Sequence, residues 1–207
     1  MWLVVPAPAG HSNDAAPATF LAMRAPEHIS SARLTLRRPV HTDAQAIYQA
    51  YAGDASVTRM LAWPCHTSID DTVAFIDWSD SEWATRSVGP YVILDQSGAV
   101  IGSTGLDVEA PHRAATGYVL ARQAWGHGYA TEATHTMAVL ADELGISRLY
   151  ALCHPENRAS TNVLRKTGFM REGLLRRHTV FPNLHPAAPH DVECWARLSG
   201  ESWSQPG

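Results

Sequence analysis

Charged side chains are scarce in this 207-residue chain: they make up 17% of the residues, and the formal net charge is only -4. Such a low charged fraction argues against a highly charged disordered chain. A protein that binds nucleic acid needs a basic face to neutralise phosphates, and 16 Lys and Arg against 20 Asp and Glu give no such excess. We therefore expect no nucleic-acid partner, although an isolated basic patch stays open.

Cysteine is also rare. The three cysteines, Cys65, Cys153 and Cys194, are far apart, so they predict no disulfide framework, and no two of them have metal-site spacing. None of the eleven histidines forms a His-x-x-x-His or His-Glu-x-x-His pattern, and the adjacent Cys65 and His66 lack partners at ligand spacing. We expect no metal site and a reducing, cytoplasmic setting.

Long hydrophobic runs are missing as well. No apolar run approaches the roughly 18 residues of a membrane span, and the short apolar start has no basic region, since the first cation is Arg24. We expect a soluble protein with no membrane partner. Residues 1–31 are rich in Ala, Pro and Ser without a regular period, which is typical of a mobile or loosely packed extension. Met23 is an alternative start.

The chain does contain enough apolar sequence for a core, at 45% hydrophobic residues. The length indicates one domain, which we place at residues 32–200, followed by a C-terminal tail at residues 201–207. A monomer and a homodimer both stay open.

The first half of this domain has the pattern of an antiparallel sheet with helices. Alternating apolar and polar residues predict a strand at 33–37. A capping box at 42–45, and Ser68 followed by two acids, predict two helix starts. Further strands are predicted at 91–94, 99–101 and 116–120, the first two joined as a hairpin.

The second half changes pattern. A glycine loop at 126–128 leads into a helix with an apolar stripe, and a strand follows at 148–152. This βαβ order predicts two parallel strands with a right-handed crossover. A short helix at 158–166 and two C-terminal strands, the second at 191–198, complete an α/β (α+β mixed) fold. We expect a central, mostly antiparallel sheet with one parallel step and helices on both faces.

The glycine loop is the first candidate binding site. A helix start presents unpaired N–H groups and a partial positive charge, and glycines let a phosphate approach that backbone closely. A dinucleotide fingerprint fits poorly, because Thr131 stands at the third glycine position and Arg148 where an acid is expected. No Walker motif exists in the chain. The chemistry indicates a pyrophosphate held by main-chain donors.

The loop, QAWGHGYA at 123–130, resembles the acetyl-CoA loop of the GCN5-related N-acetyltransferase (GNAT) superfamily. Residues 157–169, NRASTNVLRKTGF, are similar to the second CoA-side motif of that family. WGHGYATEA at 125–133 looks most like the ribosomal-protein-alanine N-acetyltransferase (RimJ/RimL-like) branch, as do RLTLR at 33–37, Trp63-Pro64 and the closing residues 190–192. The resemblance covers residues 33–198 and implies the GNAT fold.

The resemblance implies an acyltransferase that passes an acetyl group from acetyl-CoA directly to a primary amine. The thioester of acetyl-CoA would lie where the strand at 116–120 diverges from its neighbour. A backbone N–H near Val119 or Leu120 would polarise the thioester carbonyl. Asn157 would contact the pantetheine arm, and Ser160 would protonate the leaving thiolate. The implied cofactor-binding set is Tyr118, Val119, Leu120, Gln123, Gly126, His127, Gly128, Tyr129, Ala130, Thr131, Asn157 and Ser160.

Two family features are missing here. Many relatives place a tyrosine acid where this chain has Leu164, and some carry a glutamate base where it has residues 177–180. The base is therefore unassigned, with candidates Glu82, Asp107, Glu109, His154 and His178. Glu132, in the first helical turn, is expected to be structural. Trp63, Trp78, Trp83 and Tyr91 are either core residues or the lining of an acceptor pocket.

The acceptor amine, a protein N-terminus or a small molecule, stays open. One alternative is a catalytically weak module of the same fold that senses CoA, motivated by the missing tyrosine and glutamate. A nucleotide-binding or redox protein is the remaining alternative.

Overall fold

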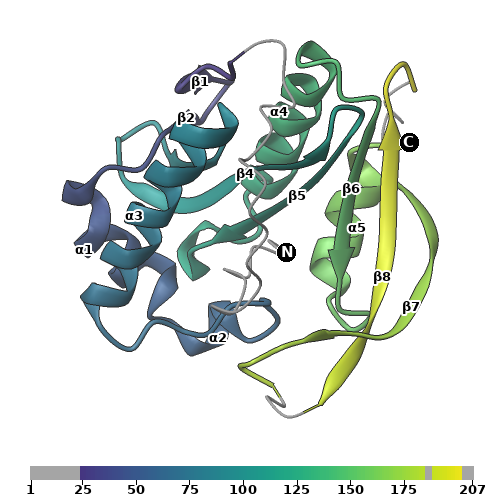
Figure 1. Cartoon of the computed structure of the whole chain (residues 1–207). Helices are drawn as coiled ribbons and strands as arrows, with labels where there is room; N and C mark the ends of the chain where they lie inside the picture. The colour runs from purple at the N-terminus through teal and green to yellow at the C-terminus, as the bar shows by residue number, and fades with distance from the viewer. Residues whose placement is uncertain (1–23, 185–187, 202–207) are drawn as a thin grey trace.

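The chain is described by a computed structural model that covers residues 24–184 and 188–201 (Figure 1). One sheet of eight strands runs in the order β1-β2-β3-β4-β5-β6-β8-β7, and all neighbours are antiparallel except β5 and β6, which are parallel. The expected mixed sheet with one parallel step is therefore confirmed. The strands are β1 (His28–Ser30), β2 (Thr35–Arg37), β3 (Pro90–Leu94), β4 (Val100–Ala110), β5 (Arg113–Leu120), β6 (Arg148–Cys153), β7 (Met170–Val180) and β8 (Pro189–Leu198).

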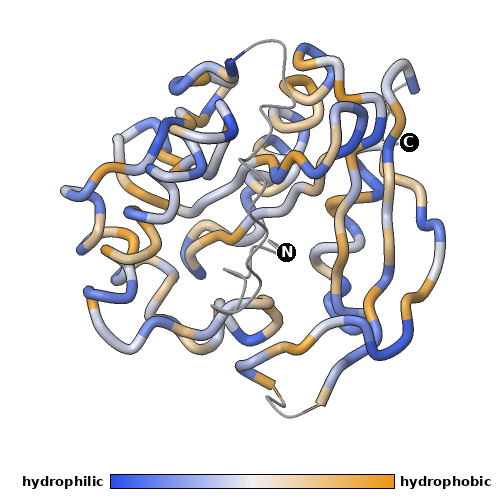
Figure 2. The backbone as a smooth tube through the Cα atoms, in the orientation of Figure 1, coloured by the Kyte–Doolittle hydropathy of each residue, from blue (hydrophilic) through white to orange (hydrophobic). Residues whose placement is uncertain are grey.

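Helices cover both faces of the sheet, as expected (Figure 1). They are α1 (Ala44–Ile47), which continues into a π-helical turn (Tyr48–Ala52), α2 (Ala55–Thr58), α3 (Ile69–Arg86), α4 (Tyr129–Glu143) and α5 (Arg158–Lys166). Short 3-10 turns precede α1 (His41–Asp43) and α4 (Arg122–Ala124). Hydrophobic segments follow the central strands, while the outer loops are more hydrophilic (Figure 2).

Two hydrophobic cores lie against the sheet. The larger one holds the apolar stripe of α4, in which Ala133 and Met137 are fully buried. The second packs Ile47 of α1 and Ile76 of α3 against strand residues that include Val119. Because each core needs its own helical layer, α4 and α1–α3 are fixed on opposite sides of the strands.

The helix starts show one confirmed and one wrong prediction. Ser68 caps α3, and its N–H donates to the Asp71 carboxylate at 3.1 Å. The predicted box at 42–45 does not form: α1 starts at Ala44, but the 3-10 turn before it begins at His41 and has its own cap. The Asp43 carboxylate instead accepts from the Val40 N–H at 2.9 Å and pairs with Arg37 at 2.7 Å, so Val40 is the cap.

The sheet begins inside the segment that composition assigned to an extension. Strand β1 pairs with β2 through Ile29 and Leu36, and Ala25 is buried. Composition missed this strand because three residues are too few to show a period. Residues 1–23, which include Met23, lie outside the described residues.

The strands β5 and β6 pair over only three residues each. Residues 113–115 of β5 pair with residues 148–150 of β6, and the two strands then diverge (Figure 1). Strand β5 nevertheless continues to Leu120 and β6 to Cys153. We call this unpaired region, residues 116–120 with 151–153, the split.

Candidate active site

The backbone of β5 offers free donors to the split. The Ala121 N–H donates to the Ile101 carbonyl of β4 at 2.8 Å. Since successive residues of a strand direct their N–H groups to opposite sides, Val119 also faces β4, where it is paired with Ser103. The N–H groups of Tyr118 and Leu120 therefore face the split. Of the two predicted donors, only Leu120 has this orientation.

The glycine loop closes the open end of the split. Gly126 and Gly128 have φ values of +78° and +80°, a backbone conformation that favours glycine. Gly128 is the N-cap of α4, and a side chain at Gly126 would meet no atom within 4 Å. The loop backbone is thus exposed at a helix N-terminus, which is an arrangement suited to an anion.

The other predicted loop residues lie beside the two glycines, between the end of β5 and the first turn of α4. Gln123 lies exposed in the 3-10 turn, and His127 is exposed between the two glycines. Tyr129, Ala130 and Thr131 form the first turn of α4 and are half-buried. All of these residues come from one short connection between β5 and α4.

An N-terminal arginine holds this loop in place, a feature that the sequence did not reveal. The Arg33 guanidinium donates to the His127 carbonyl at 2.9 Å and to the Glu132 carboxylate at 2.8 Å. It also lies over the Tyr129 ring, 4.8 Å from the centroid, and the His127 ring stacks on Tyr129. The segment before β2 therefore positions the loop.

Glu132 has the structural role that we expected. Its carboxylate accepts hydrogen bonds from Ser31 Oγ and from the backbone N–H of Arg33, both at 2.7 Å. Burial opposes the ionised form, but these bonds and the Arg33 charge outweigh it and lower the pKa of Glu132. The carboxylate joins the N-terminal segment to α4.

Trp125 ties the loop to the end of β5. Its indole N–H donates to the Leu120 carbonyl at 2.8 Å, and the His127 Nδ1 lies 2.8 Å from the Trp125 carbonyl oxygen. The Leu120 carbonyl is thereby occupied. The backbone position of Leu120 is fixed beside the split.

Ser160 lies on the other side of the split, in the first turn of α5. It is buried, and its backbone N–H donates to Asn157 Oδ1 at 3.1 Å, so Asn157 caps the helix. The Tyr118 hydroxyl donates to Ser160 Oγ at 3.3 Å. Burial raises the pKa of Tyr118 to about 12, so its phenol stays protonated. The split thus joins β5 and α5 through two hydroxyls.

Leu164, at the position of the family's tyrosine, takes no part in the hydrogen bond between Tyr118 and Ser160. Leu164 is 4% exposed and packs in the larger core. Tyr118 instead brings a phenol to Ser160 from a different element, the strand β5. Sequence reasoning placed Tyr118 in the cofactor set but attached no role to its hydroxyl.

Three candidate bases lie away from the split. Glu82 and Asp107 both pair with Arg86, at 3.1 and 3.0 Å, and burial raises the pKa of each. Glu109 pairs with Arg113 and also contacts the Tyr150 hydroxyl, beside the paired ends of β5 and β6.

The two histidine candidates differ in place. His178 is exposed on the edge strand β7. His154 is buried directly after β6, with its ring 5.2 Å from the Phe181 ring and 5.4 Å from the His190 ring. Burial lowers the pKa of His154, so its imidazole is neutral at pH 7. Of the five candidates, His154 lies nearest in sequence to the open end of the split.

A cavity of about 560 Å³ opens on the α1–α3 side of β5. It is lined by Trp63, Phe75, Trp78 and His66, with Ser103 and Val119 contributed by the strands. We call it the aromatic cavity. Trp63 and Trp78 thus fit the predicted pocket lining.

The other two aromatic candidates are core residues. Trp83 and Tyr91 are fully buried and pack edge to face with ring centroids 5.2 Å apart. The Trp83 indole N–H donates to the Pro90 carbonyl at 3.0 Å. For these two residues the pocket alternative is wrong, because both rings fill the sheet core.

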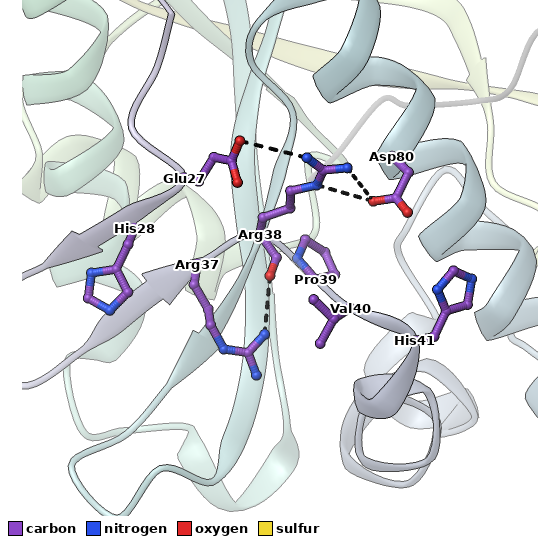
Figure 3. A pocket seen from close by; sticks show the side chains of 8 residues that line it. All are labelled: Glu27, His28, Arg37, Arg38, Pro39, Val40, His41 and Asp80. Atoms are coloured by element: carbon purple, nitrogen blue, oxygen red, sulfur yellow. Dashed lines mark hydrogen bonds and ion pairs between the residues drawn. The ribbon is translucent and has the colours of Figure 1, made fainter.

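A second hollow lies at the β1–β2 edge of the sheet, three strands from β5 (Figure 3). Both of its arginines already pair with acids: Arg38 contacts Asp80 at 2.8 Å and Glu27 at 3.7 Å, and Arg37 contacts Asp43 at 2.7 Å. Nothing in this hollow points to a ligand, so we place the site at the split.

Among residues 24–184 and 188–201, no helix is long and apolar enough to cross a membrane. Within the same ranges, no group of three or more His, Cys, Asp or Glu side chains is arranged to hold a metal ion. Cys65 and His66 instead belong to the wall of the aromatic cavity.

The split sheet with a glycine-capped helix defines the class of the protein, and comparison with known proteins agrees. Residues 33–170 match the family model described as "Acetyltransferase (GNAT) domain". An uncharacterized N-acetyltransferase, p20, of Bacillus licheniformis is 31% identical over 156 residues, which is 72% of this chain and 86% of that protein. The chain belongs to the GNAT acetyltransferase family.

Solved structures share the fold. RimL, a ribosomal L7/L12 alpha-N-protein acetyltransferase in complex with coenzyme A, aligns with a TM-score of 0.74 and 24% identity over 84% of this chain and 98% of that one. The microcin C7 self-immunity acetyltransferase MccE, in complex with acetyl-CoA and AMP, also has a TM-score of 0.74, at 22% identity over 84% and 97%. The expected family, fold and acyltransferase class are confirmed, with acetyl-CoA as the co-substrate.

Proposed function

We propose that this enzyme transfers the acetyl group of acetyl-CoA directly to the nitrogen of a primary amine, either a protein N-terminus or a small molecule. The observation that carries the proposal is the split, which the Leu120 N–H faces from β5 and across which Tyr118 of the same strand hydrogen-bonds to Ser160 of α5. An amide donor on one side and a proton donor on the other are what thioester aminolysis needs.

The glycine loop would bind the pyrophosphate of the co-substrate. Its exposed backbone N–H groups at the start of α4 favour negative charge. Gln123 and the loop from Gly126 to Thr131 supply these contacts, and Arg33 keeps the loop in one conformation. Asn157, fixed as the cap of α5, would contact the pantetheine arm.

The transfer itself uses groups at the split. The neutral amine attacks the thioester carbonyl carbon, and the Leu120 N–H stabilises the negative charge that develops on the carbonyl oxygen. The new C–N bond forms as the C–S bond breaks. The leaving thiolate takes its proton from the Ser160 hydroxyl, which Tyr118 orients by its hydrogen bond. The proton that the acetylated nitrogen loses restores the Ser160 hydroxyl, so the products are a neutral amide and the CoA thiol.

A neutral imidazole fits the base better than any carboxylate candidate does. Glu82, Asp107 and Glu109 are occupied by arginines away from the split. Burial lowers the pKa of both His154 and His66, so each ring is neutral at pH 7 and offers a lone pair to the proton of the incoming amine. His154 follows β6, and His66 lines the aromatic cavity.

The test is acetyl transfer from acetyl-CoA to a panel of primary amines, measured by the release of the CoA thiol. Transfer by the wild type, with a loss of kcat in Ser160→Ala, is the expected result. If acetyl-CoA binds but no amine is acetylated, the alternative of a CoA-sensing module replaces this proposal.

A further inference from the structure

The aromatic cavity lies where an acceptor must enter. Val119 forms part of its wall, and Val119 is a neighbour of Leu120 on β5. The cavity therefore borders the strand that carries the carbonyl donor. Its volume of about 560 Å³ falls within the range of small-molecule pockets.

The walls of the cavity favour an apolar body. Trp63, Phe75 and Trp78 supply three aromatic side chains, and the Phe75 and Trp78 rings lie 6.0 Å apart. Among the described lining residues Asp71 is the one carboxylate, and no Lys or Arg of residues 24–184 and 188–201 joins it. A single carboxylate is a poor partner for a ligand with several ammonium groups.

That carboxylate is also occupied. Asp71 accepts hydrogen bonds from the Thr67 N–H at 2.7 Å, the Thr67 hydroxyl at 3.0 Å and the Ser68 N–H at 3.1 Å. These bonds start α3 and lower the pKa of Asp71, with the Thr67 N–H as the largest cause. Asp71 is therefore committed to the helix cap.

The Tyr51 hydroxyl is a poorly satisfied polar group of the lining. Tyr51 is 2% exposed, and its hydroxyl makes no hydrogen bond of good geometry with the described residues; burial raises its pKa, and a contact with Ser103 lowers it only in part. The Ser103 hydroxyl donates to the Tyr91 carbonyl at 2.9 Å. A buried hydroxyl without a partner costs free energy, so such a group is explained if a ligand completes it.

The position of Tyr51 sets a length for that ligand. Ser103 is on β4 and pairs with Val119 of β5, whereas the split is on the opposite edge of β5. Neighbouring strands lie about 4.8 Å apart. An acceptor with its amine at the split therefore reaches Tyr51 with a polar atom roughly 5 Å or more from that amine.

We propose that the acceptor is a small aromatic primary amine whose ring packs among Trp63, Phe75 and Trp78 and whose distal polar atom hydrogen-bonds to the Tyr51 hydroxyl. This inference rests on the proposed acetyl transfer and specifies its substrate class. Tyr51 is then a specificity residue of the enzyme.

The experiment compares kcat/KM for four acceptors: tyramine, phenethylamine, spermidine and a peptide with an N-terminal alanine. Tyramine has the ring and a distal hydroxyl, and phenethylamine lacks only that hydroxyl. We expect tyramine to exceed phenethylamine by about tenfold, the effect of one hydrogen bond, and to exceed spermidine and the peptide by more.

Two variants test the contacts. Tyr51→Phe should abolish the preference for tyramine over phenethylamine with little change in Tm, because the hydroxyl that it removes makes no hydrogen bond of good geometry with the described residues. Trp78→Ala should lower kcat/KM for both aromatic amines about tenfold or more while acetyl-CoA still raises Tm. Leu174→Ala, an exposed apolar residue on β7, is the control and should change neither.

Failure of this inference and failure of the proposed function give different results. This inference is overturned if kcat/KM for spermidine or the peptide equals that for tyramine. It is also overturned if Tyr51→Phe keeps the preference for tyramine over phenethylamine. In both cases the proposed acetyl transfer stands. Acetyl-CoA binding without transfer to any of the four amines or to the wider panel overturns the proposed function, and this inference with it.

Discussion

The Tyr118 hydroxyl donates to Ser160 Oγ at 3.3 Å, across the point where β5 and β6 diverge. The hydrogen bond leaves the Ser160 proton free to point toward a leaving sulfur. The pKa of Tyr118, raised to about 12 by burial, keeps the phenol protonated through the working pH range. The pair supplies a phenol beside the serine, although Leu164 replaces the family's tyrosine.

Replacing Ser160 by Ala is expected to lower kcat by about 10² or more, within the range of general acid catalysis. Tyr118→Phe should lower kcat less, because the serine remains and only its orientation is lost. The KM for acetyl-CoA should stay within a factor of two or three in both variants. Steady-state kinetics at two pH values measure the split between kcat and KM, and a Tyr118→Phe effect confined to KM would contradict the positioning role.

Arg33→Ala is expected to raise the KM for acetyl-CoA about tenfold, which corresponds to 1.4 kcal/mol. The change removes the donors to His127 and Glu132 that hold the glycine loop. Arg24→Ala, which breaks an exposed ion pair with Glu27, is the matched control and should leave KM unchanged. Equal KM values for both variants would show that the loop is ordered without Arg33.

Asn183 joins the β7–β8 connection to the segment before α3. Its side chain donates to the carbonyls of Thr58 and Trp63, at 2.8 and 2.9 Å, and accepts from the Cys65 N–H at 2.9 Å. Asn183→Ala leaves these groups without partners, so the free energy of unfolding should fall by about 1–3 kcal/mol.

The same change should raise the acceptor KM, because Trp63 and Cys65 line the aromatic cavity. Gln96→Ala, an exposed residue of the β3–β4 turn, serves as the control. Chemical denaturation measures the free energy of unfolding, and acetyl-transfer kinetics measure the acceptor KM. A loss of stability with unchanged acceptor KM would place the Asn183 contacts outside the acceptor site.

Stability should fall as the pH drops from 7.5 to 5.5. Burial lowers the pKa of His66, His135 and His154 in the folded protein below the ordinary value of 6.5. The unfolded chain therefore binds more protons than the folded one below pH 6.5, and the free energy of unfolding rises with pH there, by at most about 1.4 kcal/mol per pH unit for each proton.

Urea denaturation at a series of pH values checks this direction. The variant His66→Gln should flatten the slope because it removes one titrating group. A slope of the opposite sign would mean that these imidazoles gain charge partners on folding.

The sequence predicted most of the fold because its signals were local. The α5 bounds, the hairpin around Gly98 and the parallel step follow from periodicity and glycine placement. The capping box predicted at 42–45 was wrong, since Asp43 is engaged by Arg37, six residues away, and by the Val40 N–H. Such a side-chain pair leaves no mark in a local pattern.

The site was predicted less completely. The glycine loop, Asn157 and Ser160 come from two motifs that resemble a family. Contacts between distant segments escaped: Arg33 with Glu132 spans 99 positions, and Asn183 with Thr58 spans 125. Of the aromatic cavity only Trp63 and Trp78 were predicted; the rest of its wall was not, because Tyr51 and Val119 meet only in the folded chain.

The most direct test of the central claim is the thermal stabilisation of the protein by acetyl-CoA. At 100 times its dissociation constant, a ligand that binds only the folded state adds about 2.7 kcal/mol. The variant Gly126→Asp/Gly128→Asp places negative charge and side chains where φ is positive at the loop. Gly98→Asp/Gly145→Asp imposes the same strain at two positive-φ turns outside the loop and is the matched control. Our account predicts a shift for the wild type and the control and none for the loop variant; the absence of a shift in the folded wild type would contradict it.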